Sequence, residues 1–219
     1  MSGVSLVIGS TGLIGKQLIF ELAKKDSEVI AITRRSISNL PENVTLFDIN
    51  FDDFLDNGSL PSCDHIYICL GTTIKKAGSQ SEFKKVDFDY SVSFARKARE
   101  AGATKISLVS SVGANPYSKN FYLKTKGEVE EEIKKIDFQS INIFRPSLLL
   151  GHREEGRFLE KIGQNLSSFI NPLLIGSLRK YRGIKSSNVA YFMANCEKSS
   201  GIKYFYFDDF NNNFERENQ

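Results

Sequence analysis

The sequence has few cysteines and prolines, and these shortages exclude several classes of protein. Its 219 residues include three cysteines, Cys63, Cys69 and Cys196, whose odd number and spacing fit neither a disulfide framework nor a zinc site. The five prolines form no proline-rich linker, and no low-complexity tract or repeat divides the chain. We therefore expect reduced thiols, no bound metal and a single domain over residues 1–219.

Long apolar runs and blocks of like charge are also missing. No apolar stretch approaches the length of about 18 residues that a membrane-spanning helix requires. The N-terminus enters a strand-like run, VSLVIG, with no basic region of the kind that opens a signal peptide. The net charge of +3 comes from dispersed Lys and Arg, which argues against a surface that binds polyanions. These features predict a cytoplasmic protein that binds neither membrane nor nucleic acid.

The chain instead shows an alternation of strand-like and helix-like segments. Apolar runs rich in β-branched residues recur at 4–9, 28–33, 44–49, 65–71, 105–111 and 141–151. Continuous runs of this kind suit strands that are buried on both faces of a parallel sheet. Helical spacing lies between several of them, as at Phe83, Val86, Tyr90, Phe94 and Ala98. The pattern predicts an α/β fold, a Rossmann-type doubly wound parallel sheet.

The pattern is looser beyond residue 151. Residues 151–200 are largely polar and turn-rich, apart from a helical stretch around 188–196, and a strand-like run follows at 202–207. We expect residues 151–200 to form a small C-terminal subregion on the substrate side, over the carboxyl ends of the strands.

A glycine-rich turn follows the first expected strand. The sequence GSTGLIG places Gly9, Gly12 and Gly15 three residues apart, directly before an amphipathic segment. Glycines at such a turn let backbone amides approach a pyrophosphate, and the start of the helix adds a partial positive charge. The turn therefore predicts dinucleotide binding. The alternative is a turn that serves packing alone.

The end of the second expected strand bears on the choice of dinucleotide. An NAD site usually has an acidic residue there, whereas an NADP site replaces it with arginine near the 2′-phosphate. The sequence ITRRS offers Arg34 and Arg35 and no carboxylate, which favours NADP over NAD. The alternative is a pair of solvated arginines.

A tyrosine and a lysine lie one helical turn apart further along the chain. Tyr122 and Lys126 have the spacing that places both side chains on one face of a helix. A nearby ammonium favours the ionised form of a phenol, which suits proton exchange with a carbonyl or an alcohol. A serine at the end of the preceding strand, Ser111 or Ser110, can hold the same oxygen. The alternative is that Tyr122 and Lys126 are ordinary surface residues.

Taken together, these motifs resemble the atypical branch of the short-chain dehydrogenase/reductase superfamily, and most closely the Tat-interacting-protein-like oxidoreductases. The resemblance runs along nearly the whole chain. Its landmarks are GSTGLIGKQL, TRR, CLGTTIKKAG, KVDFDY, LVSSVGA, FYLKTKGEVE and FRPSLLLG.

The resemblance implies a role for particular residues. It assigns the catalytic roles to Ser111, Tyr122 and Lys126, with Ser110 as the alternative serine. It assigns NADP(H) binding to Gly9, Thr11, Gly12, Leu13, Ile14, Arg34, Arg35, Asn50, Leu70, Gly71, Thr72, Thr73, Ser110, Tyr122, Lys126, Arg145, Pro146, Ser147 and Leu148. The chain departs from its relatives in two places: Asn50, followed by Phe51, stands where many carry Asp, and Asp87 stands where active members often carry Asn.

The resulting expectation is an NADPH-dependent reductase of a small carbonyl compound. Two alternatives stay open: a non-catalytic protein that senses the redox state of NADP(H) and contacts a protein partner, and an epimerase- or dehydratase-like enzyme that retains its cofactor. The sequence names neither the substrate nor the oligomeric state. Three other features have simpler interpretations: His65 is expected to be structural, His152 a loop residue, and Glu130 a member of an exposed pair with Lys134.

Overall fold

Seven strands form one parallel sheet in the order β3-β2-β1-β4-β5-β6-β9. The computed structural model describes residues 3–25, 28–34, 37–151, 171, 174–196 and 200–211, with the backbone alone at residues 56 and 57. The elements of the sheet and its helices are β1 (Val4–Ile8), α1 (Leu13–Ala23), β2 (Glu28–Thr33), β3 (Val44–Asp48), α2 (Phe51–Asn57), β4 (His65–Ile68), α3 (Ile74–Ala77), α4 (Gln80–Lys84), η1 (Lys85–Asp89), α5 (Tyr90–Glu100), β5 (Lys105–Val109), α6 (Phe121–Lys134), β6 (Ser140–Phe144), α8 (Ser186–Asn195) and β9 (Gly201–Phe205). This strand order is that of a Rossmann fold, so the predicted fold class is confirmed.

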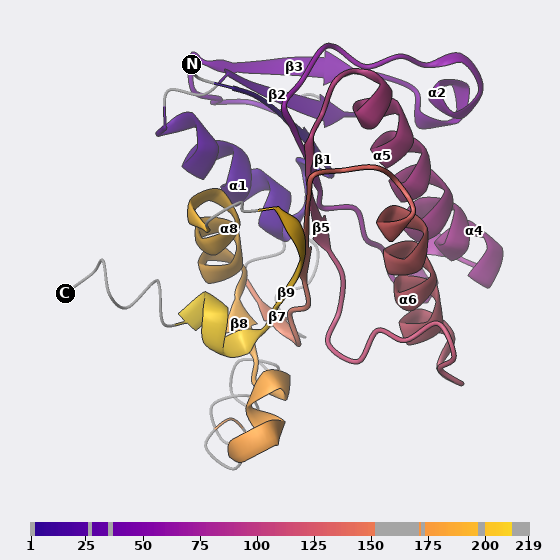
Figure 1. Ribbon diagram of the computed structural model, residues 1–219, viewed down its shortest axis with the longest axis vertical. Coiled ribbons are helices and arrows are strands. Elements are labelled where there is room, and N and C mark those ends of the chain that lie inside the picture. The colour runs from indigo at the N-terminus through magenta and orange to yellow at the C-terminus, as the bar shows by residue number, and fades with distance from the viewer. Residues whose placement is uncertain are drawn as a thin grey trace.

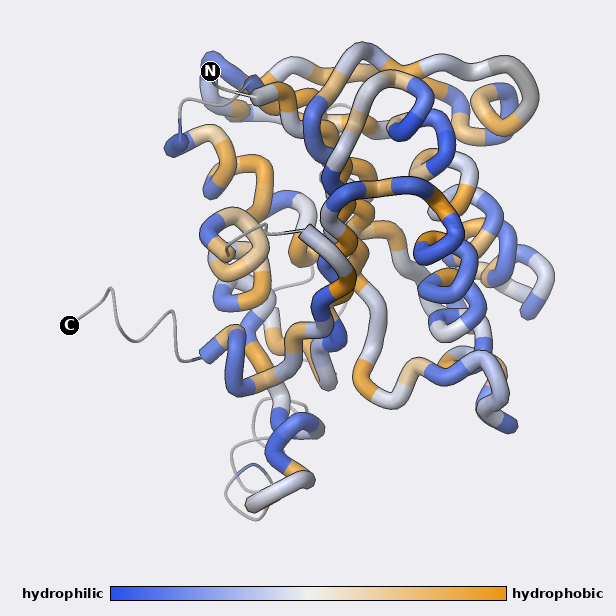
Figure 2. The backbone as a smooth tube through the Cα atoms, viewed as in Figure 1, coloured by the Kyte–Doolittle hydropathy of each residue, from blue (hydrophilic) through white to orange (hydrophobic). Residues whose placement is uncertain are grey.

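Helices cover both faces of the sheet. Figure 1 shows α1 and α8 on one side and α4, α5 and α6 on the other. Side chains alternate along each strand between two buried cores, one beneath α1 and α8 and one beneath α2, α5 and α6. In Figure 2 the strands and the inward sides of the helices are mostly hydrophobic, and the outward turns of α5 and α6 are hydrophilic. All residues of β4 and β6 are buried, which explains their continuous apolar runs.

Two expected strands differ most from the sequence pattern. The run 65–71 ends its strand at Ile68: the amide of Cys69 makes one more contact with β1, at the carbonyl of Ile8, and the amide of Thr72 then donates to Asp87. The run 141–151 divides at Pro146, which has no N–H to donate. Its second part becomes β7 (Leu149–Leu150), which pairs with β8 (Ile184–Lys185) in a separate two-stranded sheet.

The helical spacing between 83 and 98 also conceals an irregularity. A π-helical turn, η1, separates α4 from α5 and inserts one extra residue into the helix. As a result Phe83, Tyr90 and Phe94 are buried as expected, but so is Asp87. The π-helical turn therefore directs a carboxylate inward, at the ends of β4 and β5.

Part of the expected substrate-side subregion lies among the described residues. A 3-10 helix, η3 (Gly176–Tyr181), precedes β8 and α8, and α8 packs against α1. Residues 152–170, which include His152, lie outside the described residues. Within the described ranges, no helix is long and apolar enough to cross a membrane.

Candidate functional site

The glycine turn between β1 and α1 is built by close backbone contacts. Gly9 has a positive φ of 79°, and a Cβ atom there would lie 2.5 Å from the carbonyl oxygen of Cys69. A Cβ atom on Gly15 would lie 2.2 Å from the carbonyl oxygen of Gly9, so the start of α1 packs directly on the turn. Gly12 is exposed and donates its amide to the carbonyl of Gly9 at 2.9 Å. The turn fits the glycine roles of a dinucleotide cradle.

The other residues of this turn that were predicted to bind the cofactor differ in the exposure of their side chains. Thr11 is exposed and Leu13 is half-buried, so both side chains lie near the open side of the turn. Ile14 is 5% exposed and packs in the core beneath α1 and α8. A contact between Ile14 and a cofactor would therefore come from its backbone at the start of the helix.

A hollow of about 460 Å³ lies beyond the ends of β2 and β3. It is lined by Arg34, Asp48, Ile49 and Asn50. The side chain of Asn50 accepts from the amide of Asp52 at 2.9 Å and caps α2, so it is already engaged. Arg34 is exposed and borders the hollow, whereas Arg35 lies outside the described residues. Asp48 is a carboxylate of this hollow that the sequence analysis overlooked, because it ends an apolar strand pattern.

The segment after β4 lines the space between the glycine turn and α6. Leu70 is half-buried, and a Cβ atom on Gly71 would have no neighbour nearer than 3.9 Å. The amide of Thr72 donates to Asp87 Oδ2 at 2.9 Å, and the side chain of Thr73 caps α3. Gly71 is exposed and lies within contact distance of the Asp87 carboxylate and the Lys126 ammonium, so a cofactor could approach its backbone there.

Lys126 is buried and paired with Asp87. The Nζ atom of Lys126 lies 2.7 Å from Asp87 Oδ1, and the two side chains are 7% and 0% exposed. Burial alone lowers the pKa of Lys126, but interactions with Asp87, Tyr122 and Glu130 outweigh that effect and raise the pKa above its usual value. Lys126 is therefore a fixed cation at neutral pH.

Tyr122 lies one turn before Lys126 on α6, at the start of the helix. It is half-buried, and its ring contacts Phe83 edge-on at 5.8 Å between centroids. Asn120 caps the helix through its side chain, which accepts from the amide of Leu123 at 3.1 Å. Tyr122 and Lys126 thus lie on one face of an ordered helix, as the spacing predicted.

The two serines after β5 have different surroundings. Ser110 is 4% exposed, and its hydroxyl donates to Glu130 Oε1 in a short hydrogen bond. Ser111 is half-buried, and its hydroxyl makes one long contact with the carbonyl of Val112, at 3.4 Å. Only the Ser111 hydroxyl is therefore available to a substrate oxygen without breaking a strong contact.

Glu130 is not the exposed residue that the sequence analysis expected, and this interpretation is wrong. Its side chain is 1% exposed and accepts from Arg145 through both carboxylate oxygens. Lys134, its expected partner, pairs with Glu131 at 2.8 Å instead. The helix turns Glu130 inward because it lies four residues after Lys126 and eight after Tyr122, on the same face.

Arg145, at the end of β6, is fully engaged. Its guanidinium donates to Glu130 and, at 3.1 Å, to the hydroxyl of Tyr206, and it lies over the ring of Tyr204. Burial lowers the pKa of Arg145, but the hydrogen bonds and charge of Glu130 raise it overall. The guanidinium thus joins α6 to the sheet, and only its backbone is open to the cofactor contact that the sequence analysis assigned to it.

The three residues after Arg145 complete the set that was predicted to bind the cofactor. The carbonyl of Pro146 accepts from the amide of Val112 at 2.9 Å, which ties this segment to the residue after Ser111. The hydroxyl of Ser147 donates to the carbonyl of Arg182 in a short contact, so it is engaged. Leu148 is 58% exposed and leaves an apolar side chain open to solvent.

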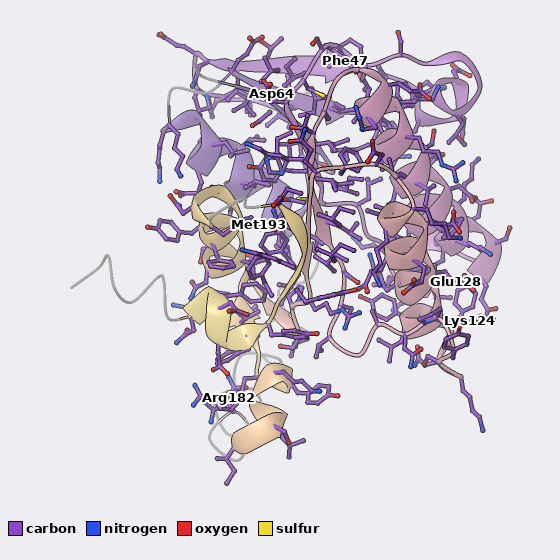
Figure 3. The ribbon with its side chains drawn as sticks, in the orientation of Figure 1. Phe47, Asp64, Lys124, Glu128, Arg182 and Met193 are labelled. Atoms are coloured by element: carbon purple, nitrogen blue, oxygen red, sulfur yellow. The ribbon has the colours of Figure 1, made fainter. Side chains whose placement is uncertain are left out.

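Side chains on the outer face of α6 are unrelated to this site. Lys124 and Glu128 point away from the sheet in Figure 3 and form a loose pair at 3.9 Å.

His65 is buried in β4, where its Nε2 atom lies 2.9 Å from the Ser107 hydroxyl and its ring stacks on Tyr67, which confirms its structural role. No group of side chains in the described ranges could hold a metal ion.

Of the two missed residues Asp87 and Glu130, only Glu130 had a signal in the sequence. Tyr122, Lys126 and Glu130 follow one another at intervals of four, which places a carboxylate on the inner face of the helix. Asp87 was noted only as a departure from relatives, because the π-helical turn that buries it has no clear sequence pattern.

Comparison with known proteins places this chain in a family. Residues 5–212 match the family described as NAD dependent epimerase/dehydratase family. The chain is 33% identical over 184 residues to the protein FMP52, mitochondrial, of Candida albicans, with 80% of each chain covered. It is 34% identical over 160 residues to the protein HTATIP2 of Rattus norvegicus, covering 69% of this chain and 64% of the relative.

Solved structures support the fold. Human epimerase family protein SDR39U1 with NADPH superposes with a TM-score of 0.62 at 18% identity, covering 93% of this chain and 74% of that one. UDP-glucose 4-epimerase from Thermotoga maritima superposes with a TM-score of 0.67 at 15% identity, covering 93% and 76%. At these identities the likeness extends to the fold alone.

The relatives correct one expectation. The cytoplasmic localisation predicted from the sequence is contradicted, because similar proteins from Candida albicans, Debaryomyces hansenii and Saccharomyces cerevisiae are named mitochondrial. The absence of a recognisable signal-peptide region was therefore a poor guide. The resemblance itself is confirmed: this chain belongs to the NAD dependent epimerase/dehydratase family, within the atypical short-chain dehydrogenases/reductases that include the Tat-interacting-protein-like members.

Proposed function

We propose that the protein is an NADP(H)-dependent oxidoreductase that reduces a small carbonyl compound through Ser111, Tyr122 and Lys126. This proposal rests on the buried ion pair between Lys126 and Asp87, which lies beside Gly71. Lys126 is on the same face of α6 as Tyr122. A buried cation next to a phenol and an open glycine suits a site where a proton is moved to a substrate oxygen.

The cofactor would lie across the carboxyl ends of the strands. The amides of the turn from Gly9 to Leu13 would hold its pyrophosphate, and the segment from Leu70 to Thr73 would cover it. Lys126 would hold the nicotinamide ribose in the space beside Gly71. Arg34 borders the hollow in which the adenosine 2′-phosphate would lie, and Asp48 could accept from the adenine amine. The reduced nicotinamide, when bound, supplies a hydride.

The protein's own residues would supply the proton and hold the oxygen. Tyr122 would donate its phenolic proton to the oxygen of the carbonyl group as negative charge develops there. Ser111 would donate a hydrogen bond to the same oxygen, and Lys126 would add a fixed positive charge nearby. Ser110 would take no direct part, because its hydroxyl is engaged by Glu130.

We also propose that residues 1–219 form one domain, with 151–200 on the substrate side. The contact between Ser147 and Arg182 and the pairing of β7 with β8 support this arrangement, since both join the described part of this subregion to the segment after β6. Leu148, exposed beside that contact, would give the substrate an apolar neighbour.

The name of the family favours a second candidate, an epimerase- or dehydratase-like enzyme that returns the hydride to its substrate. Consumption of NADPH with a panel of small aldehydes, ketones and quinones separates the candidates. Net consumption that requires Tyr122 supports the reductase. Purification with tightly held cofactor and no net consumption would favour the epimerase, and NADPH binding with no turnover at all would favour a sensing protein.

A further inference from the structure

The guanidinium of Arg34 lies over the ring of Phe51, 4.9 Å from the ring centroid. Arg34 is an exposed residue directly after β2, and Phe51 is the first residue of α2 and 4% exposed. This separation lies within the range of attractive cation–π contacts. A long, flexible side chain at the edge of the hollow therefore has an aromatic partner before any ligand is bound.

Phe51 is itself held rigidly by other aromatic rings. It packs edge-on against Tyr90 at 5.3 Å and against Phe94 at 5.1 Å. The Tyr90 hydroxyl donates to Asp52 Oδ1 at 2.5 Å, which fixes the first turn of α2 against α5. Because its neighbours are packed, the ring of Phe51 gives Arg34 a fixed surface.

The hollow also contains a carboxylate that could compete for Arg34. Asp48 lines it beside Arg34, Ile49 and Asn50, and its strand partner is Thr33, the residue before Arg34. Without the aromatic ring, the guanidinium could turn toward this carboxylate, which would cancel its charge. A phosphate entering the hollow would then meet Asp48 and a neutralised arginine.

We propose that Phe51 is a specificity-determining residue for the adenosine 2′-phosphate, because it holds the guanidinium of Arg34 in the position where that phosphate must bind. This inference rests on the proposed binding of NADP(H). A pre-positioned arginine loses less conformational freedom on binding, so the ring strengthens phosphate binding without touching the phosphate. NADH has no 2′-phosphate and gains nothing from the arrangement.

The test compares NADPH and NADH binding to the full chain by fluorescence titration. Phe51→Met keeps an apolar side chain, somewhat smaller than the ring, and removes the π face. Phe54→Met is the matched control, because Phe54 is equally buried at 4% exposed, stacks on Phe94 and lies under Lys97 instead of Arg34. Thermal unfolding of both variants checks that they are folded to the same extent, and Arg34→Ala is made alone and combined with Phe51→Met.

We expect Phe51→Met to weaken NADPH binding about two- to fivefold, to leave NADH binding unchanged and to have no further effect in the Arg34→Ala background. Equal losses for both cofactors, or the same losses in Phe54→Met, would overturn the role of Phe51 while the effect of Arg34→Ala still supports NADPH binding. If Arg34→Ala itself leaves NADPH binding unchanged, Arg34 does not bind the 2′-phosphate and the role of Phe51 fails, whereas loss of NADPH binding in Gly12→Val would still support the cofactor site.

Discussion

The ammonium of Lys126 and the carboxylate of Asp87 form an ion pair that is almost completely buried, with 2.7 Å between Nζ and Oδ1. A buried charge is tolerated only when it is paired, so each residue depends on the other. The π-helical turn η1 supplies the carboxylate, and α6 supplies the ammonium. Together with the Glu130–Arg145 pair, this contact fixes α6 at two points and so positions Tyr122 at the ends of the strands.

Removal of one partner of the first pair should be costly. We expect Asp87→Ala to lower the free energy of unfolding by about 3–5 kcal/mol, because Lys126 would remain buried without a counter-charge. The double variant Asp87→Ala/Lys126→Met should be less destabilised than Asp87→Ala alone. Urea unfolding measures both, and Glu128→Gln is the control, since that residue forms loose, solvent-accessible pairs with Lys84 at 3.8 Å and Lys124 at 3.9 Å. Equal stability of Asp87→Ala and Glu128→Gln would refute the structural role of the pair.

Substitution of Ser110 should mainly lower stability, whereas substitution of Ser111 should mainly lower the rate of turnover. Ser110→Ala removes a hydrogen bond to a buried carboxylate and should cost about 1.5–3 kcal/mol of stability with little effect on turnover. Ser111→Ala should leave stability within about 0.5 kcal/mol. Its turnover should fall by about 10²- to 10³-fold, as for other donors to a developing oxyanion. Chemical denaturation and initial rates measure the two effects, and the reverse pattern would make Ser110 the catalytic serine.

Substitution of Gly12 should mainly affect cofactor binding, whereas substitution of Gly15 should mainly affect stability. Gly12→Val should fold, because Gly12 has an ordinary φ of −79° and its tight Cβ contact, 3.2 Å from the carbonyl of Gly9, needs a shift of only a few tenths of an ångström. It should lose dinucleotide binding, since the side chain would stand where the pyrophosphate approaches. Gly15→Ala should instead cost about 1–3 kcal/mol of stability through its contact with backbone. A folded Gly12→Val that binds NADPH normally in calorimetry would remove the turn from the cofactor site.

Stability should decline at alkaline pH. Burial raises the pKa of the Cys69 thiol to about 12 and that of Cys63 to about 11, both from 9.0, and interactions with Asp87 raise that of Lys126. Above pH 9 the unfolded chain therefore releases thiol protons that the folded chain retains, so rising pH favours unfolding. Urea midpoints should be nearly constant up to pH 8 and fall between pH 9 and pH 11. A midpoint that rises across that window would contradict the assigned burial of these groups.

The fold was predictable because its signals are local and repeated. The apolar runs of β1, β2 and β5 mark strands buried on both faces, and the turn from Gly9 to Gly15 marks the first crossover. The exact ends of β4 and β6 were not predictable, since the apolar runs continue beyond them, through Leu70 after β4 and to Leu150 after β6.

The sequence predicted the types of residue in the candidate site, but it did not predict how its charged side chains are paired. The interval between Tyr122 and Lys126 predicted one helix face, and the structure has that face. The partners of these residues come from other elements: Asp87 from a π-helical turn, and Arg145 from the end of β6. Such contacts depend on tertiary packing, so Glu130 looked like half of an exposed pair with Lys134 although it is buried.

The transfer of deuterium from NADPH labelled on the reactive carbon of its nicotinamide tests the proposed function most directly. A carbonyl compound that the protein consumes should yield an alcohol with deuterium on the former carbonyl carbon, detected by mass spectrometry. Tyr122→Phe should bind NADPH with nearly unchanged affinity and form labelled alcohol about 10²- to 10⁴-fold more slowly. The account would be contradicted if the wild-type protein transferred no label to any carbonyl compound, or if Tyr122→Phe transferred it at the wild-type rate.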